Sequence, residues 1–408
     1  MWIREKVTKS VADNMVEKVG DVEDLTHDAE PDRDVFLFDV TGNGIVADYL
    51  RHQGFAVLGG SVLCDRLERD RSFGYSVMAD CEIDTPETRS FTDFERAIAF
   101  VEKNPDRRWV YKPSKGLGDL SPSHVSYDAP DLIQMLSNIH DEADIAEPQF
   151  ELQSFESGVA LSTELWFQNG ELIEPLVNHT LERKELMNDD VGPSGGCSGN
   201  LTWFCAGCKA CRVARQLVSW ALSERYHGML DLNVIVSRRR IYGLEFTPRF
   251  GYDAAPTLLF ELVRGGVGAF LETVARGQVD RLDLRDGFAG GIRLTVPPYP
   301  TEIIHNTINC EAEENVPIRG IDDDRDIYWY DVKKDSEGNL VTSGAYGVIG
   351  VFSAHSADPR HAVAKPLEPL RALKLKNKQF RTDLHNVFVN DLEKLETIGV
   401  ELNVYAAD

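Results

Sequence analysis

Long apolar runs are absent from this sequence. No stretch comes close to the roughly 20 apolar residues that a membrane-spanning helix needs, and the start, MWIREKVTKS, lacks the apolar segment of a secretory signal. Basic residues are also in deficit: 43 Lys and Arg stand against 67 Asp and Glu, for a formal net charge of −24. A surface of that sign repels nucleic acid. We therefore expect a cytoplasmic monomer or homodimer whose partners are small molecules, not nucleic acid or membranes.

Cysteine is scarce, with seven in 408 residues, which excludes a disulfide scaffold. Four of the seven nevertheless cluster, as Cys197 and the CAGCKAC residues Cys205, Cys208 and Cys211. Four thiolates at these spacings could form a Cys₄ zinc site, and CxxCxxC also resembles iron–sulfur ligation. If a helix starts near residue 208, however, Cys208 and Cys211 face the core as small apolar residues. We expect metal-free thiols, with structural zinc as the alternative.

A Walker A phosphate loop, GxxxxGK[ST], is also missing. The stretch WVYKPSKGLGDLSPSHV at 109–125 instead predicts a strand that carries Lys112 near its end, followed by a loop rich in Gly, Ser and Pro. A lysine in that place can reach phosphate oxygens while the backbone N–H groups of 114–118 cover them. The alternative is a surface lysine before a loop.

The rest of the chain alternates strands with helices. VFLFD at 35–39 and FAVLGG at 55–60 predict two buried strands of a βαβ unit around a TGNG turn. The stretch 90–105 predicts a helix with Thr92 and Glu95 as its capping box. The last third turns strand-rich. The fold class predicted is α/β (α+β), in two or three domains with their own cores.

One short strand concentrates polar chemistry. In YGLEFTPRFGYD, residues 242–253, Glu245, Thr247 and Arg249 alternate with apolar residues, so a strand would put all three on one face. A partner strand adds Asn233 twelve residues before Glu245, with Asp231 on the same face. A carboxylate, neutral oxygens and a guanidinium together favour a site for a metal ion and a phosphate. A solvated strand face is the alternative.

Four motifs, in order, resemble those of one family. GGSVLCDRLERDRSFGYSVM resembles a helix of the ATP-grasp ligases, and WVYKPSKGLG resembles their phosphate loop. VGPSGGCSG at 191–199 resembles a TGPNTGGMG loop, and LEFTPRFG resembles IEFNxRFGDPE. The family member with these motifs is glycinamide ribonucleotide synthetase, or phosphoribosylamine–glycine ligase. The resemblance runs from about residue 35 to about residue 353.

The resemblance implies ATP and Mg²⁺, or Mn²⁺, as cofactors. It implies that residues 151–155 line the adenine, that Glu164 or Glu156 lies near the ribose, and that a lysine and glycine loop holds the phosphates. The implied ATP-binding set is Arg71, Lys112, Lys115, Gly116, Gly118, Gln153, Glu156 and Glu164.

The resemblance also implies how the other substrate is held. The carboxylate substrate would lie against the glycine loop, the metal on the Glu245 strand, and two cations beside the reacting groups. The implied substrate-binding residues are Gly192, Pro193, Ser194, Gly195 and Gly196, the metal ligands Glu245, Thr247 and Asn233, and the catalytic residues Arg249 and Lys184.

The implied fold is an ATP-grasp fold with a truncated Rossmann-like N-terminal domain and a β-rich C-terminal domain. The expected domains are 1–88, the reduced N-terminal part; 89–285, the ATP-grasp domain with lobes at about 89–150 and 151–285; and 286–408, the β-rich domain.

The implied activity joins a carboxylate to an amine through an acyl phosphate, as in purine biosynthesis. Arg71 replaces a lysine of the family and Thr247 an asparagine, and polar residues stand where the family has its sugar-phosphate loop. Two alternatives follow: a ligase for a different amine, such as an amino acid or a modified nucleotide, and an ATP-binding protein without turnover.

Overall fold

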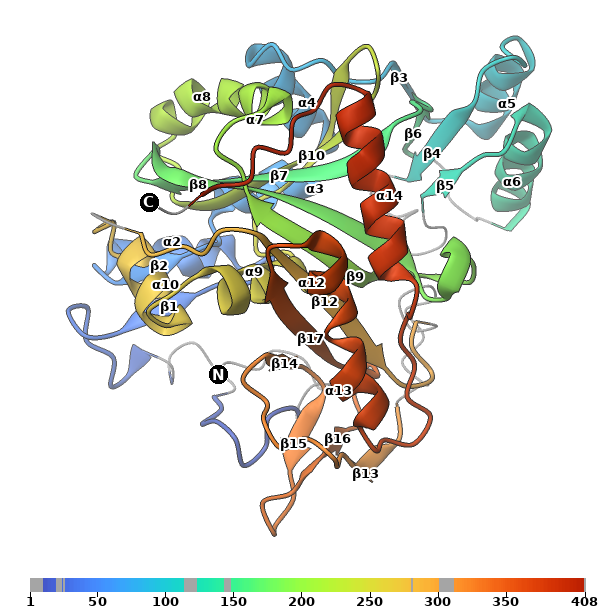
Figure 1. Ribbon diagram of the computed structural model, residues 1–408. Helices are drawn as coiled ribbons and strands as arrows, with labels where there is room; N and C mark the ends of the chain where they lie inside the picture. The colour runs from blue at the N-terminus through green and yellow to red at the C-terminus, as the bar shows by residue number, and fades with distance from the viewer. Residues whose placement is uncertain are drawn as a thin grey trace.

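The computed structural model describes residues 10–19, 24, 26–113, 123–142, 148–279, 282–300 and 312–406. An antiparallel eight-stranded sheet forms its centre, in the order β11-β10-β7-β8-β9-β12-β17-β14 (Figure 1). These strands are β7 (Val159–Gln168), β8 (Glu171–Glu185), β9 (Ser194–Phe204), β10 (Gly228–Val236), β11 (Ile241–Thr247), β12 (Phe288–Thr295), β14 (Ile327–Trp329) and β17 (Val348–Ser356). Among the described helices, none is long and apolar enough to cross a membrane.

Both faces of this sheet are covered, which explains why its strands are apolar almost throughout. Leu165 and Trp166 are neighbours on β7, yet they belong to two different apolar clusters, because successive side chains point to opposite faces. The first cluster involves α3 (Val62–Arg69), α4 (Arg71–Asp80), α7 (Lys209–Ala214), α12 (Pro359–Ala364), α13 (Leu367–Ala372) and α14 (Leu384–Thr397). The second involves α9 (Ala254–Leu262) and α10 (Val267–Ala275).

The turn between β7 and β8 shows how local sequence sets the sheet register. Asn169 and Gly170 both have positive φ, 51° and 89°, which suits a tight hairpin turn. Short helices η3 (Arg215–Leu217) and α8 (Val218–Ser223) follow α7, and η2 (Asn188–Asp190) lies between β8 and β9.

A smaller sheet carries Lys112. Its order is β3 (Thr88–Phe91), β6 (Phe150–Ser154), β4 (Trp109–Pro113), β5 (His124–Val125), and it packs on α5 (Phe94–Glu102) and α6 (Ala129–Glu142) at one end of the molecule (Figure 1). The predicted helix at 90–105 is therefore α5. Its cap differs from the prediction: Asp93, not Thr92, accepts a hydrogen bond from the N–H of Arg96 at 2.9 Å.

The N-terminal part holds the predicted βαβ unit in small form. β1 (Val35–Leu37) pairs in parallel with β2 (Ala56–Leu58), and α2 (Gly44–His52) connects them. No further strand joins this pair among the described residues.

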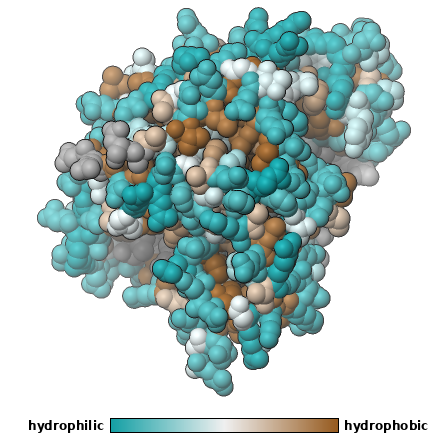
Figure 2. Space-filling view, in the orientation of Figure 1, coloured by the Kyte–Doolittle hydropathy of each residue, from teal (hydrophilic) through white to brown (hydrophobic). Residues whose placement is uncertain are grey.

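The C-terminal region continues the central sheet past residue 285, because β12 pairs with β9 and β17 with β12. A three-stranded sheet of β13 (Glu314–Pro317), β16 (Leu340–Ser343) and β15 (Val332–Lys334) lies at its end (Figure 1). The face in Figure 2 is mostly hydrophilic with apolar patches between the elements, in keeping with the acidic composition.

Candidate active site

The β10–β11 hairpin brings the predicted metal ligands together. Asn233 lies opposite Glu245, and Asp231 lies opposite Thr247. The Asn233 Nδ2 donates to Asp231 Oδ2 and to Thr247 Oγ1, both at 3.0 Å. Alternation thus puts all four polar groups on one face, as the spacing predicts, while Phe246 points into the core on the other face.

Further carboxylates extend this polar face into the sheet. Asp231 lies opposite Glu164 of β7, and Glu182 of β8 is close enough to both to act on their charge. Burial raises the pKa of Asp231 well above its usual range, and Glu164 and Glu182 add to that shift. Burial likewise raises the pKa of Glu164 to about 7.

This carboxylate group suits a divalent cation. Carboxylates that repel one another at short range, next to neutral amide and hydroxyl oxygens, are the donor set that Mg²⁺ and Mn²⁺ prefer. The buried Asp231 Oδ1 has no hydrogen-bond partner. A cation at this place would satisfy that atom and offset the repulsion.

Lys112 supplies positive charge from the smaller sheet. Its side chain is 9% exposed and lies on β4 opposite Glu151 of β6. Burial lowers the pKa of Lys112, the charge of Glu245 raises it again, and Arg71 and Lys184 also act on it. Residues from four elements, β4, β11, α4 and β8, therefore face one another.

The predicted nucleotide-binding residues nearby are held by protein contacts. Arg71 Nη1 lies 3.8 Å from Glu151 Oε2 and donates to the carbonyl of Pro113 at 3.2 Å. Gln153 Nε2 donates to Tyr75 Oη at 2.8 Å. Glu156 Oε1 accepts a hydrogen bond from Ser154 Oγ at 2.9 Å at the end of β6.

Several predicted residues are placed differently from the expected pattern. Arg249 lies two residues beyond the end of β11, and its Nε and Nη2 donate to Glu68 Oε1 of α3 at 3.1 and 3.0 Å. The strand prediction is thus wrong for Arg249. Glu164, expected near a ribose, accepts hydrogen bonds from Asn178 and Thr180 inside the sheet. Lys115, Gly116 and Gly118 lie outside the described residues.

The predicted glycine loop connects β8 to β9. Gly192 and Pro193 are in the connection, whereas Ser194, Gly195 and Gly196 already belong to β9. A Cβ on Gly195 would lie 2.4 Å from Tyr299 Oη, so only glycine fits there. Gly196 has a φ of +83°, and a Cβ there would meet nothing within 4 Å. The chain is therefore crowded at one glycine and open at the next.

A buried ion pair supports this loop, and nothing in the local sequence pointed to it. Arg293 Nε and Nη2 donate to the two carboxylate oxygens of Asp253 at 2.7 and 2.5 Å, and neither side chain is more than 7% exposed. Arg293 Nη1 also donates to the carbonyl of Gly195 at 3.1 Å, and the Tyr299 hydroxyl donates to the same carbonyl. Only the fold brings Asp253 and Arg293, forty residues apart, into contact.

The cysteine set also needs a correction. His179, Cys205, Cys208 and Cys211 form a buried group, and Cys197 is not part of it. Cys197 lies elsewhere on β9, with its Sγ 3.5 Å from the carbonyl of Gly199. Burial raises the pKa of the Cys197 thiol, and Asp253 raises it further.

Comparison with known sequences agrees with the motif resemblance. No protein-family model matches the chain. The phosphoribosylamine–glycine ligase of Corynebacterium ammoniagenes is 25% identical over 381 residues, or 88% of this chain and 84% of that protein. The trifunctional purine biosynthetic protein adenosine-3 of Drosophila pseudoobscura pseudoobscura is 26% identical over 271 residues, or 62% of this chain. The chain spans 19% of that fly protein's length and 20% of its Drosophila melanogaster counterpart.

Comparison with solved structures concerns the fold. The phosphoribosylamine–glycine ligase of Thermotoga maritima aligns with a TM-score of 0.67 at 18% identity, over 89% of this chain and 88% of that one. A biotin carboxylase from Campylobacter jejuni aligns with a TM-score of 0.60 at 13% identity, over 89% and 80%. The chain therefore has the α+β ATP-grasp fold and is similar in sequence to the phosphoribosylamine–glycine ligases.

Proposed function

We propose that the chain is an ATP-dependent carboxylate–amine ligase that forms an amide through an acyl phosphate. The observation that carries the proposal is the meeting of Lys112, Arg71 and Lys184 with Glu245, from separate elements, beside buried carboxylates. Cations facing a carboxylate face suit the phosphates of ATP together with a metal ion. The sequence relatives, which are named as ligases, support the same reading.

The residues divide the work by charge. Lys112 and Arg71 would neutralise phosphate oxygens, with Gln153 and Glu156 on the neighbouring β6 toward the nucleoside. Asp231, Asn233, Thr247 and Glu245 would hold Mg²⁺ or Mn²⁺, which when bound neutralises phosphate charge and aligns the phosphates for transfer.

The reaction needs positioning more than it needs a base. In the first step a substrate carboxylate oxygen attacks the γ-phosphorus of ATP, and ADP leaves. In the second step an amine attacks the acyl carbon, phosphate leaves, and the amine loses a proton to solvent. Lys184 and Arg249 would stabilise the negative charge of the carboxylate and the acyl phosphate. Arg249 would do so while still bonded to Glu68, which fixes its direction.

We expect the carboxylate substrate to be a small amino acid, with glycine as the first choice. The crowding of Gly195 against Tyr299 supports a small substrate at the loop. The amine is a separate question, because the N-terminal unit consists of a two-stranded sheet and one connecting helix in the described residues. That small unit favours a second candidate function, a ligase for an amine other than phosphoribosylamine.

The test is ADP release over a panel of amino acids, with and without candidate amines, and with product mass measured. Phosphoribosylamine should be generated in situ for one arm. We expect ADP release to depend on a small amino acid and phosphoribosylamine to be a poor acceptor. Efficient formation of glycinamide ribonucleotide would refute the second candidate function. Tight ATP binding without ADP release under any condition would refute the ligase proposal and indicate a nucleotide-binding protein.

A further inference from the structure

Four potential metal ligands converge on the sheet face opposite the candidate active site. His179 of β8 lies between Asn178 and Thr180, which both bond Glu164, so its ring points to the other side of the sheet. There it meets Cys205, just after β9, together with Cys208 and Cys211 at the start of α7. All four side chains are buried, and their ligand atoms lie within 4.8 Å of one another.

The distances between these atoms suit a single small ion. His179 Nε2 lies 3.1 Å from Cys208 Sγ and 3.3 Å from Cys211 Sγ. Cys211 Sγ lies 3.3 Å from Cys208 Sγ and 3.2 Å from Cys205 Sγ. Ligands of a tetrahedral zinc, with Zn–S of about 2.3 Å and Zn–N of about 2.0–2.1 Å, are about 3.5–3.8 Å apart. The four atoms thus need to move outward by only about half an ångström to surround zinc.

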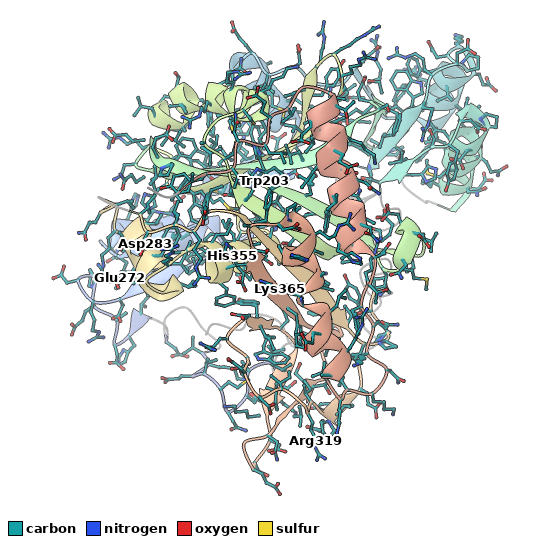
Figure 3. All side chains as sticks on the ribbon, in the orientation of Figure 1. Trp203, Glu272, Asp283, Arg319, His355 and Lys365 are labelled. Atoms are coloured by element: carbon teal, nitrogen blue, oxygen red, sulfur yellow. The ribbon has the colours of Figure 1, made fainter. Side chains whose placement is uncertain are left out.

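Neighbouring groups orient the ligands as metal sites require. Thr163 Oγ1 lies 3.0 Å from His179 Nδ1, which leaves Nε2 directed at the sulfur atoms. The backbone N–H of Cys211 donates to Cys208 Sγ at 3.3 Å, a contact that favours a thiolate. The indole ring of Trp203, labelled in the middle of the large sheet in Figure 3, lies 5.4 Å from the imidazole ring and shields it.

We propose that His179, Cys205, Cys208 and Cys211 bind one structural zinc ion. Four protein ligands close the coordination shell, so the site has no open position for catalysis. Without a metal ion, three thiols and an imidazole would gather in an apolar core with only weak hydrogen bonds among themselves. A helix near residue 208 does exist, as expected for thiols that only pack, but its first turn directs both cysteines at the histidine.

The ion would tie three parts of the fold together. It would join β8 to α7 through His179 and the helix cysteines. It would also hold the end of β9, where Cys205 forms a bridge with Val404 and the Trp203 indole N–H donates to the carbonyl of Leu402 at 3.2 Å. The C-terminal segment would therefore depend on the site for its attachment.

The test is elemental analysis of protein purified without chelator or metal-affinity resin. We expect about one zinc ion per chain in the parent, and near-complete loss in Cys211→Ser and His179→Gln. Cys64→Ser is the matched control, because Cys64 is equally buried but its Sγ faces Tyr226 Oη at 3.5 Å. It should keep its zinc.

Measurements on the parent protein keep the proposal testable if the variants fail to fold. X-ray absorption at the zinc edge should give three sulfur neighbours at about 2.3 Å and one nitrogen at about 2.0–2.1 Å. Protein without zinc, with the three thiols freely titratable after unfolding, would overturn the proposal, as would stoichiometric iron. These readouts involve no substrate, so they are independent of the proposed ligase activity.

Discussion

The two ends of the candidate active site differ in how far the protein satisfies its own polar groups. At the nucleotide end, Asp231 Oδ1 and Glu151 Oε2 are buried without a hydrogen-bond partner. At the loop end, Arg293 and Asp253 form a two-bond ion pair, and the carbonyl of Gly195 accepts two hydrogen bonds. Buried polar atoms are normally paired, so the unpaired ones mark where a ligand completes the structure.

The difference assigns separate tasks to the two ends. Unpaired charges at the nucleotide end gain partners only when an anion and a cation enter, so binding energy is available there. Paired groups at the loop end have nothing left to offer a ligand, and they fix the path of Gly195 and Gly196 instead. Substitutions at the loop end should therefore cost stability, and substitutions at the nucleotide end should cost binding and turnover.

The largest effect is expected from Asp253→Ala, which should lower the free energy of unfolding by about 3–5 kcal/mol because Arg293 would stay buried without its partner. Denaturant unfolding followed by fluorescence measures it. The control is Asp323→Asn, which removes an Asp–Arg pair on the surface and should leave stability nearly unchanged.

The double variant Asp253→Leu/Arg293→Met sharpens this result. Replacing both charges with apolar side chains removes the unpaired charge, so it should recover part of the lost stability. If the double variant is less stable than Asp253→Ala, the ion pair itself contributes net stability, and our explanation of the loss is wrong.

Glu245→Gln should act at the other end. Glu245 is exposed, so we expect unchanged thermal unfolding, but a fall in ADP release of about 10²–10³-fold because a charge that holds the metal ion is lost. The control is Glu171→Gln at the start of β8, an exposed glutamate outside the site. Parental turnover of Glu245→Gln at limiting Mg²⁺ would remove this residue from the metal site.

These predictions rest on residues that differ in how readily the sequence reveals them. Glu245 and Thr247 were predictable, because a two-residue spacing puts them on one strand face. Asn233 followed from the short basic turn between the two strands, which sets them side by side. A pattern of period two or a tight turn is local, so the sequence alone carries it.

The residues that sequence reasoning missed are joined only by the tertiary fold. Glu68 meets Arg249 across 181 positions, and His179 meets Cys208 across 29 positions. The spacing of the cysteines suggested Cys197 as the fourth member of their group, yet β9 carries it to a different place. The only usable signal was chemical: three closely spaced cysteines need a fourth ligand, and histidine is the usual substitute.

Lys112→Met should weaken ATP binding by about 10–100-fold, because a phosphate would lose a charged hydrogen-bond donor in a buried place. Methionine keeps most of the side-chain volume, so the fold should persist. Calorimetric titration with ATP and Mg²⁺ measures the effect. Lys103→Met, on an exposed lysine at the end of α5, serves as the control. An unchanged affinity of Lys112→Met would show that the phosphates bind elsewhere.

The smallest effect concerns the pH dependence of stability. The pKa of Glu164 is about 7 in the folded chain, against 4.5 for the ordinary side chain, because the carboxyl is buried. The folded state thus holds a proton that the unfolded state releases, so the stability contribution is complete below about pH 4.5 and is lost as pH rises through about 7. Glu164→Gln should flatten this decline by about 1–2 kcal/mol between pH 5 and pH 7 in urea unfolding without Mg²⁺. Saturating Mg²⁺ and ATP should flatten the decline in the parent as well, since a cation favours the ionised carboxylates. An equally steep decline in Glu164→Gln, matching that of Glu171→Gln, would show that the carboxylates at the nucleotide end are already paired, and the contrast between the two ends would not hold.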